Sequence, residues 1–240
     1  MPFPSRYRCG VGLAVVLVVC GLAAGCASPK VHESRSAPTG IAKGDAVAFL
    51  LLNYEVKEPA EVGPRDHAAI EQTLFSCLSK ELENAELGLL LVSPQAFREA
   101  AFPGQKADQL PKSPEAVLEL LVNGRTIGNS TMSRPRYVVL LEAGFWEAEK
   151  KPPIGLASGA GVVIGEQWAR SVTNHATVLD LAHRRVAGHL SADLFNFRND
   201  ARMRGVLLAY GFIPVPIVMA KSDDAVCTEL GRALARFLAQ

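Results

Sequence analysis

The stretch WARSVTNHATVLDLAHRRVAGHLSADLF, residues 168–195, decides the fold class. Each of its two arms, 168–181 and 186–195, carries mostly apolar residues at even positions, which is the two-residue period of a half-buried strand. Even positions must face even positions across the arms, because a slip of one residue would turn one apolar face outward. We therefore predict an antiparallel hairpin with Asp180 opposite Val186 around a turn at His183.

Strand and helix patterns alternate on both sides of this hairpin. Short apolar runs predict buried strands, and apolar residues at helical spacing behind Ser-Pro or acidic starts predict helices. The predicted strands are 46–54, 89–92 and 137–142, and the predicted helices begin near Asp66, Ser93, Ser113 and Asp223. Residues 196–204 are polar and predict a loop. This order predicts a single α/β domain over 41–240, with a mixed β-sheet and helices packed mainly on one face.

The composition is that of an ordinary globular protein. The chain has 240 residues, of which 49% are apolar and 20% are charged, and these values exclude a disordered or low-complexity protein. Lysine and arginine number 25 against 24 aspartates and glutamates, so we expect no nucleic-acid partner. The sequence has no Walker A or HExxH motif, and its histidines lack metal-ligand spacing. We therefore expect no cofactor and no metal.

The beginning of the chain has the features of a targeting signal and is not part of the folded domain that we predict. Arg6 and Arg8 precede the uncharged run 11–22, which is too short to span a bilayer as a helix. The residues LAAGC at 22–26 resemble the lipobox of bacterial lipoproteins; the alternative is an ordinary signal peptide with a chance cysteine. The resemblance implies a signal peptide at 1–25 and acyl chains such as palmitate on Cys26.

The residues after Cys26 indicate in which membrane we expect the protein. Position 27 is alanine rather than the aspartate that often retains lipoproteins at the inner membrane. By the same resemblance, we expect a lipid anchor in the outer membrane, with the protein facing the periplasm. Two or three acyl chains hold a protein at a membrane stably, whereas one chain binds only marginally. The polar residues that follow show no periodicity, so we predict a flexible tether over 26–40.

Two other cysteines of the mature chain predict a disulfide. Cys77 and Cys227 lie on the apolar faces of the predicted first and last helices. The periplasm is oxidising, and helices over one sheet face can bring the two residues together. We predict a Cys77–Cys227 disulfide; the alternative is two buried free thiols that act as small hydrophobic side chains.

The glycine-rich segment 154–166 is the most unusual part of the sequence. It contains small and apolar residues, and we predict a loop there. One interpretation is a loosely packed loop, and the other is an element that contacts a partner protein or the membrane. Its glycines allow close approach of another backbone, and its apolar surface would come from Ile154, Val162, Val163, Ile164 and Trp168. These five residues are the candidate partner-binding residues.

A hydrolase-like set of side chains appears on the polar positions of the predicted hairpin. The predicted register brings His175 close to Ser191 and Thr177 close to His189, with Asp193 one pair further along. Serine, histidine and aspartate on one sheet face are compatible with nucleophilic catalysis. However, the sequence has no nucleophile elbow, since Leu156 stands where a GxSxG motif around Ser158 requires glycine. A solvated or partner-binding face is the simpler interpretation.

Several local signatures resemble one group of envelope proteins. The order of elements, with the hairpin residues Val178, Asp180 and Val186, resembles the amino-terminal domain of the TolB translocation protein. Envelope lipoproteins with that fold include the activator of a penicillin-binding protein and the curli secretion lipoprotein. FREAAFPG at 97–104, YVVLLE at 137–142 and VLDL…RVAGHLSA at 178–192 resemble a group of bacterial lipoproteins more closely. No catalytic residue accompanies the resemblance, and the short tether departs from the activator.

The resemblance and the lipobox together suggest three functions. The first is a non-enzymatic adaptor or assembly factor for envelope proteins, held at the membrane by its lipid anchor. The second is a subunit of an oligomeric secretion or transport assembly, so a homo-oligomer is possible. The third is a small-molecule hydrolase.

Overall fold

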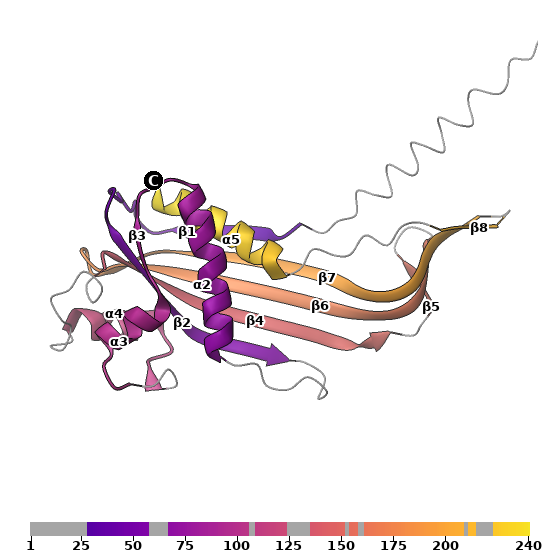
Figure 1. The fold of residues 1–240 in the computed structure, drawn as a ribbon, viewed down its shortest axis with the longest axis horizontal. Coiled ribbons are helices and arrows are strands. Elements are labelled where there is room, and N and C mark those ends of the chain that lie inside the picture. Colours follow the sequence, from indigo (N-terminus) through magenta and orange to yellow (C-terminus); the bar gives the residue numbers. More distant parts are fainter. Residues whose placement is uncertain are drawn as a thin grey trace, which may run out of the picture.

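The computed structural model describes residues 28–57, 67–105, 109–123, 135–151, 154–157, 161–208, 211–214 and 223–240. These residues form one mixed α/β domain, which confirms the predicted fold class. Its sheet has the strand order β1-β7-β6-β4-β2-β3, as Figure 1 shows. The strands on this path are β1 (Lys30–Arg35), β2 (Ala46–Lys57), β3 (Leu90–Val92), β4 (Tyr137–Lys151), β6 (Gly161–Asp180) and β7 (Arg185–Leu208).

The sheet has a parallel part and an antiparallel part. Strands β3, β2 and β4 pair in parallel, whereas β4, β6, β7 and β1 pair antiparallel. The nearly continuous apolar run of β2 is typical of a parallel strand covered on both faces. Two short strands complete the sheet: β5 (Ile154–Ala157) pairs with β6, and β8 (Gly211–Pro214) pairs with β7. The long strands β4, β6 and β7 continue well past the helices toward β5 and β8 (Figure 1).

The two longest helices, α2 (His67–Asn84) and α5 (Asp223–Leu238), cover one face of the sheet. Their buried side chains include Leu74, Leu78, Leu230 and Leu234, which pack against odd-numbered residues of β2 and β4 and even-numbered residues of β6 and β7. The opposite face carries the shorter helices α3 (Pro94–Ala101) and α4 (Pro114–Asn123). Its core joins these helices to even-numbered residues of β2 and β4 near the start of each strand.

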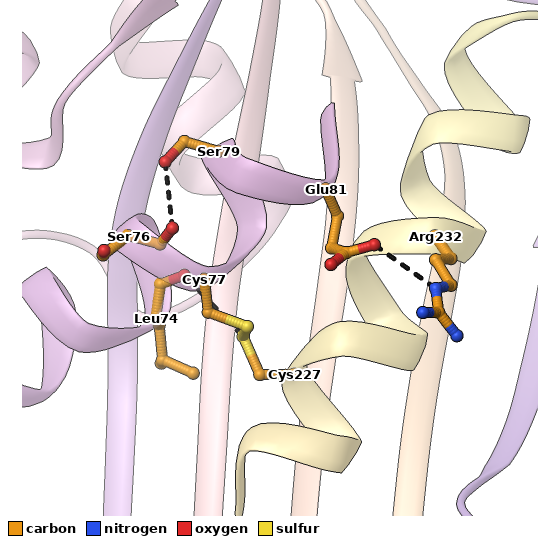
Figure 2. Close-up of a disulfide and its surroundings, with 7 residues drawn as sticks. All are labelled: Leu74, Ser76, Cys77, Ser79, Glu81, Cys227 and Arg232. Carbon is orange, nitrogen blue, oxygen red and sulfur yellow. Dashed lines mark hydrogen bonds and ion pairs between the residues drawn. A yellow bond between two sulfur atoms is a disulfide. The ribbon is translucent and has the colours of Figure 1, made fainter. Parts of the chain in front are cut away.

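A disulfide holds the long helices together, as Figure 2 shows. It joins Cys77 of α2 to Cys227 of α5, whose Cα atoms are 6.3 Å apart, so the predicted bridge is confirmed. Further along the same helix pair, Arg232 Nε lies 3.3 Å from Glu81 Oε2. The helices approach closely at Gly231, where a Cβ atom would lie 2.8 Å from Glu81 Cβ. Glycine is therefore required there for the observed packing.

Strand β1 corrects the flexible tether predicted over 26–40. Residues 30–35 pair antiparallel with β7, from Lys30 opposite Asp193 to Arg35 opposite Gly188. Val31 packs against the core, and the Arg35 guanidinium lies 4.0 Å from the centre of the Phe237 ring. The sequence did not predict this strand because a single, partly buried apolar residue gives no visible periodicity. The described domain therefore begins before Ile41.

The described residues of the loops predicted at 154–166 and 196–204 also form strands. Within the glycine-rich segment, β5 and the start of β6 pair antiparallel, with Ile154 opposite Ile164 and Ala157 opposite Gly161. Residues 196–204 lie in β7 and continue its pairing with β6. Glycine and polar residues predicted loops here because their strand propensity is low. The partners on neighbouring strands, which the local sequence does not contain, satisfy the backbone hydrogen bonds instead.

The register predicted for the hairpin is correct along its body. His175 lies opposite Ser191, Thr177 opposite His189 and Thr173 opposite Asp193. The turn differs from the prediction, because a register shift after Val178 pairs Leu179 with Val186 and Asp180 with Arg185. Buried Asp180 stabilises this turn by accepting a hydrogen bond from the His183 backbone N–H at 3.2 Å and by contacting His183 Nδ1 at 2.7 Å.

Candidate functional site

The candidate site is the part of the sheet face that α3 and α4 leave uncovered, and we call it the open face. On β6 and β7 it contains the odd-numbered residues 171–175 and 189–195, since the even-numbered residues of these segments are buried on the other face. Residues directly opposite each other in an antiparallel pair share a face. The register therefore places three further groups on it, from β4, β2 and β1: Glu142, Gly144 and Trp146; Asn53 and Glu55; and Lys30, His32 and Ser34.

One row of the open face is polar across four strands. It runs from β1 to β4 through His32, Ser191, His175 and Glu142, each opposite the next in the printed register. The two histidines are exposed, whereas Ser191 and Glu142 are partly buried. In the adjacent row, Thr177 Oγ1 lies 3.0 Å from His189 Nδ1. Thr177 is buried, so the accessible donors and acceptors of these rows come from the other side chains.

The open face does not hold a catalytic triad among its described side chains. His175 and Ser191 are neighbours, as predicted, but no hydrogen bond joins either of them to the other or to Asp193. A serine nucleophile needs a base within hydrogen-bond reach and a third group that orients this base. Ser158 lies outside the described residues. No group of three or more metal-ligating side chains occurs within the described part of the chain.

Asp193 has an unsatisfied carboxylate. Its Oδ1 atom is buried and has no hydrogen-bond partner among the described residues. Lys30 stands opposite Asp193 on β1, but no ion pair between their side chains is present. A buried acceptor without a donor costs about 1–3 kcal/mol.

At one end of the open face lies a row of aromatic side chains. Trp146 of β4 and Phe195 of β7 both stand opposite Ser171 of β6, and they are 39% and 54% exposed. A shallow cavity of about 230 Å³ lies beside this row, lined by Glu55, Gly144, Phe145, Trp146, Ser171 and Thr173. Gly144 leaves room for the Thr173 hydroxyl, because a Cβ atom at this position would lie 2.5 Å from Thr173 Oγ1.

The pairing of Trp146 with Phe195 in one aromatic row was not predicted from the sequence. The strand predicted at 137–142 stops before Trp146, whereas β4 continues to Lys151. The signal was the unbroken pattern of Leu141, Ala143 and Phe145, which are all buried on the face under α2 and α5. Trp146 follows Phe145 directly, so the same alternation places it on the opposite face of the strand.

The five predicted partner-binding residues lie on the strands that extend from the aromatic row. Ile154 belongs to β5, and Val162, Val163, Ile164 and Trp168 belong to β6. Ile154 is directly opposite Ile164, whereas Trp168 pairs with Lys150 and Arg198. The structure thus brings four of them into one antiparallel ladder. Their role in binding stays a prediction.

The predicted lipidation site, Cys26, lies outside the described residues, four positions before the start of β1. Its acylation stays a prediction. Among the residues the structure describes, no helix combines the length and the apolar character needed to cross a bilayer.

Comparisons with known proteins add a distant likeness in structure. No family model matches the chain, and no curated protein matches it. Among solved structures, the PelC dodecamer from Paraburkholderia phytofirmans matches with 14% identity and a TM-score of 0.37, over 88% of this chain and 96% of that one. The LpoB C-terminal domain from Salmonella enterica matches with 11% identity and a TM-score of 0.36, over 65% and 87%. At these values neither match supports an argument about function.

Proposed function

We propose that this protein is a lipid-anchored component of the bacterial envelope that binds envelope proteins through its open face, as a non-enzymatic adaptor or assembly factor. The observation that carries the proposal is the open face itself. Four antiparallel strands present a polar surface that no described helix covers, although the same strands are sealed by α2 and α5 on their other face.

The chemistry of the open face favours binding. Its exposed imidazoles, its partly buried hydroxyls and the partly buried carboxylate of Glu142 offer donors and acceptors spread over four strands. Protein interfaces combine such hydrogen-bonding groups with a few aromatic side chains. The hydrolase alternative lacks support, since its serine and histidine are not joined by a hydrogen bond.

The predicted anchor would hold this surface close to the membrane. Only residues 27–29 separate Cys26 from β1, and the four steps from Cys26 to Lys30 span at most about 14 Å. An adaptor of this geometry meets its partners at the membrane surface. Strand β5 and the start of β6, with Ile154, Val162, Val163, Ile164 and Trp168, would extend the contact region in the same sheet.

Site-specific photo-cross-linking in cells tests the proposal. A photoreactive amino acid at His175 should capture a recurrent envelope protein, because this side chain is exposed at the centre of the open face. The matched control is the same amino acid at Glu83, an exposed position on α2, where we expect no capture of that protein. Equal capture at both positions, or none at His175, would contradict an adaptor that uses the open face.

The second candidate is a subunit of an oligomeric assembly. It is favoured by strand β1, which within the described sheet pairs on one side only. An unpaired strand edge is a template for pairing with another chain. In the same experiment, cross-links only between copies of this protein would select this candidate, and the size of the purified complex in detergent would then be measured.

A further inference from the structure

The described side chains include three large, exposed hydrophobic residues, and two of them lie together. They are Trp146, Phe195 and Leu90. Trp146 and Phe195 flank Ser171 on neighbouring strands, so their Cα atoms are about 10 Å apart on one face. Leu90 lies on β3, at the other edge of the sheet. Single exposed apolar residues are ordinary, whereas a pair of exposed aromatic residues on one face suggests a contact surface.

The position of the predicted anchor identifies what this pair meets. Lys30 lies opposite Asp193, two residues from Phe195 along β7, which corresponds to about 7 Å. Cys26 is four residues before Lys30 and reaches at most about 14 Å from it. The acyl chains are therefore held near the end of the sheet that carries the aromatic row.

The chemistry of the row also fits a lipid surface. Tryptophan has an apolar body and one N–H donor, and it prefers the boundary between hydrocarbon and water. The charged positions that the register places around the row balance, with Glu55 and Asp193 against Lys30 and Lys57, the last directly opposite Trp146. Attraction to anionic headgroups therefore does not drive the contact. Burial of apolar surface does.

We propose that Trp146 and Phe195 lie in the interface of the bilayer that holds the acylated Cys26. This inference rests on the lipid anchoring in the proposed function. The row then acts as a second attachment point, and it fixes the orientation of the domain so that the polar rows around His175 stay accessible to partners. A protein partner that covers the row instead is the competing outcome of the test below.

The test uses the fact that the chain has two tryptophans. In a Trp168→Phe variant, Trp146 is the only fluorescent indole. The lipidated full-length protein is reconstituted into phosphatidylcholine vesicles that contain a lipid brominated near the headgroup, which quenches indoles at the interface. We expect loss of most Trp146 emission in brominated vesicles, compared with unbrominated ones. Adding phosphatidylglycerol should not increase the quenching.

Two further variants give matched controls. In a background without Trp146 and Trp168, both replaced by phenylalanine, the changes Phe195→Trp and Leu90→Trp each introduce one indole. Both positions are 54% exposed in the structure, so solvent access does not distinguish them. We expect quenching at 195 and none at 90. Equal quenching at both positions, or no quenching at 146 and 195, would overturn the proposal.

The experiment separates failure of this inference from failure of the anchor. If the lipidated protein sediments with vesicles but Trp146 is not quenched, the aromatic row does not meet lipid while the anchor stands. If a Cys26→Ala variant remains in the membrane fraction of cells as the wild type does, the anchor itself is wrong. If circular dichroism shows that Trp168→Phe does not fold, the wild type is compared with Trp146→Phe instead. The part of the wild-type fluorescence that brominated lipid quenches should then be absent from Trp146→Phe.

Discussion

Strands β6 and β7 show two faces made from alternate residues of the same segments. Under α2 and α5, Ala176, Leu190 and Ala192 are at most 2% exposed. On the open face, the intervening residues His175 and His189 are exposed. One short sequence can therefore specify a core and an exposed polar surface at once, because a strand directs successive side chains to opposite sides. Each face can then be tested by changing neighbouring residues.

The largest change in stability is expected from loss of the disulfide that joins α2 to α5, the two helices that pack on the buried face. Replacing Cys77 and Cys227 by serine removes a bridge between residues 150 positions apart. In the chain-entropy model, we expect the free energy of unfolding to fall by about 3–5 kcal/mol. Urea denaturation of the oxidised wild type and of the variant measures the difference. The wild type under reductant is the control, and it should match the variant.

A pair of neighbouring substitutions tests the two faces directly. Leu190→Ala removes a side chain that is 2% exposed and should cost about 2–4 kcal/mol, because it leaves a cavity. Ser191→Ala changes a partly buried hydroxyl on the open face and should change stability by at most about 0.5 kcal/mol. Thermal and urea unfolding provide both values. Similar losses for the two variants would show that the open face is also core.

Glu71 extends the comparison to a polar group on the covered side. Its carboxylate accepts hydrogen bonds from the Leu51 backbone N–H at 3.1 Å and from Arg98 Nη2 at 2.7 Å. Glu71→Ala leaves both donors without this acceptor, and we expect a loss of about 2–3 kcal/mol because Arg98 keeps some access to water. Glu83→Ala, an exposed position on the same helix, is the matched control and should have little effect.

The smallest effect concerns Tyr137, which is fully buried under α2 and α5. Its hydroxyl donates a hydrogen bond to the Thr39 carbonyl oxygen, and burial, with the nearby Asp180 charge, raises the pKa of the phenol. The folded protein thus holds this proton more tightly than the unfolded chain does. The contribution of the protonated Tyr137 phenol to the free energy of unfolding is complete at neutral pH and is lost as the pH rises above about 10.

The variant Tyr137→Phe tests this contribution. At pH 7 it should lower the free energy of unfolding by about 1 kcal/mol, since it removes one buried hydrogen bond. Above about pH 10 the difference in unfolding free energy from the wild type should shrink, because only the wild type has a Tyr137 hydroxyl whose stabilising effect is lost on deprotonation. Urea denaturation at several pH values measures both curves. A difference that stays constant with pH would contradict the raised pKa.

The part of the fold that the sequence predicted correctly has a strong local period. The apolar face of α5, with Val226, Leu230 and Phe237, is buried as expected. The hairpin register is correct along the body of the hairpin, from Thr173 opposite Asp193 to Val178 opposite Gly188. Both follow from repeats of 3.6 or two residues that recur within a short window. The disulfide was predictable because both cysteines lie on such apolar faces.

The parts that the sequence did not predict depend on distant partners. Strand β1 has one residue, Val31, packed against the core, and it forms because β7, more than 150 positions away, offers an edge. The strands at 154–157 and 196–204 contain glycine or polar residues and are likewise held by their neighbours. Their pairing energy comes from backbone groups, which carry no residue-specific signal.

Local periodicity in the sequence specifies the class of fold, the two faces of the hairpin and the helix faces that meet in the core, because it sorts side chains toward or away from water. The pairing of the strands in three dimensions sets which residues of the open face are neighbours. It placed His32 beside Ser191, and it put Trp146 and Phe195 on either side of Ser171. These neighbours belong to strands far apart in the chain, and their alignment is fixed by the pairing of whole strands.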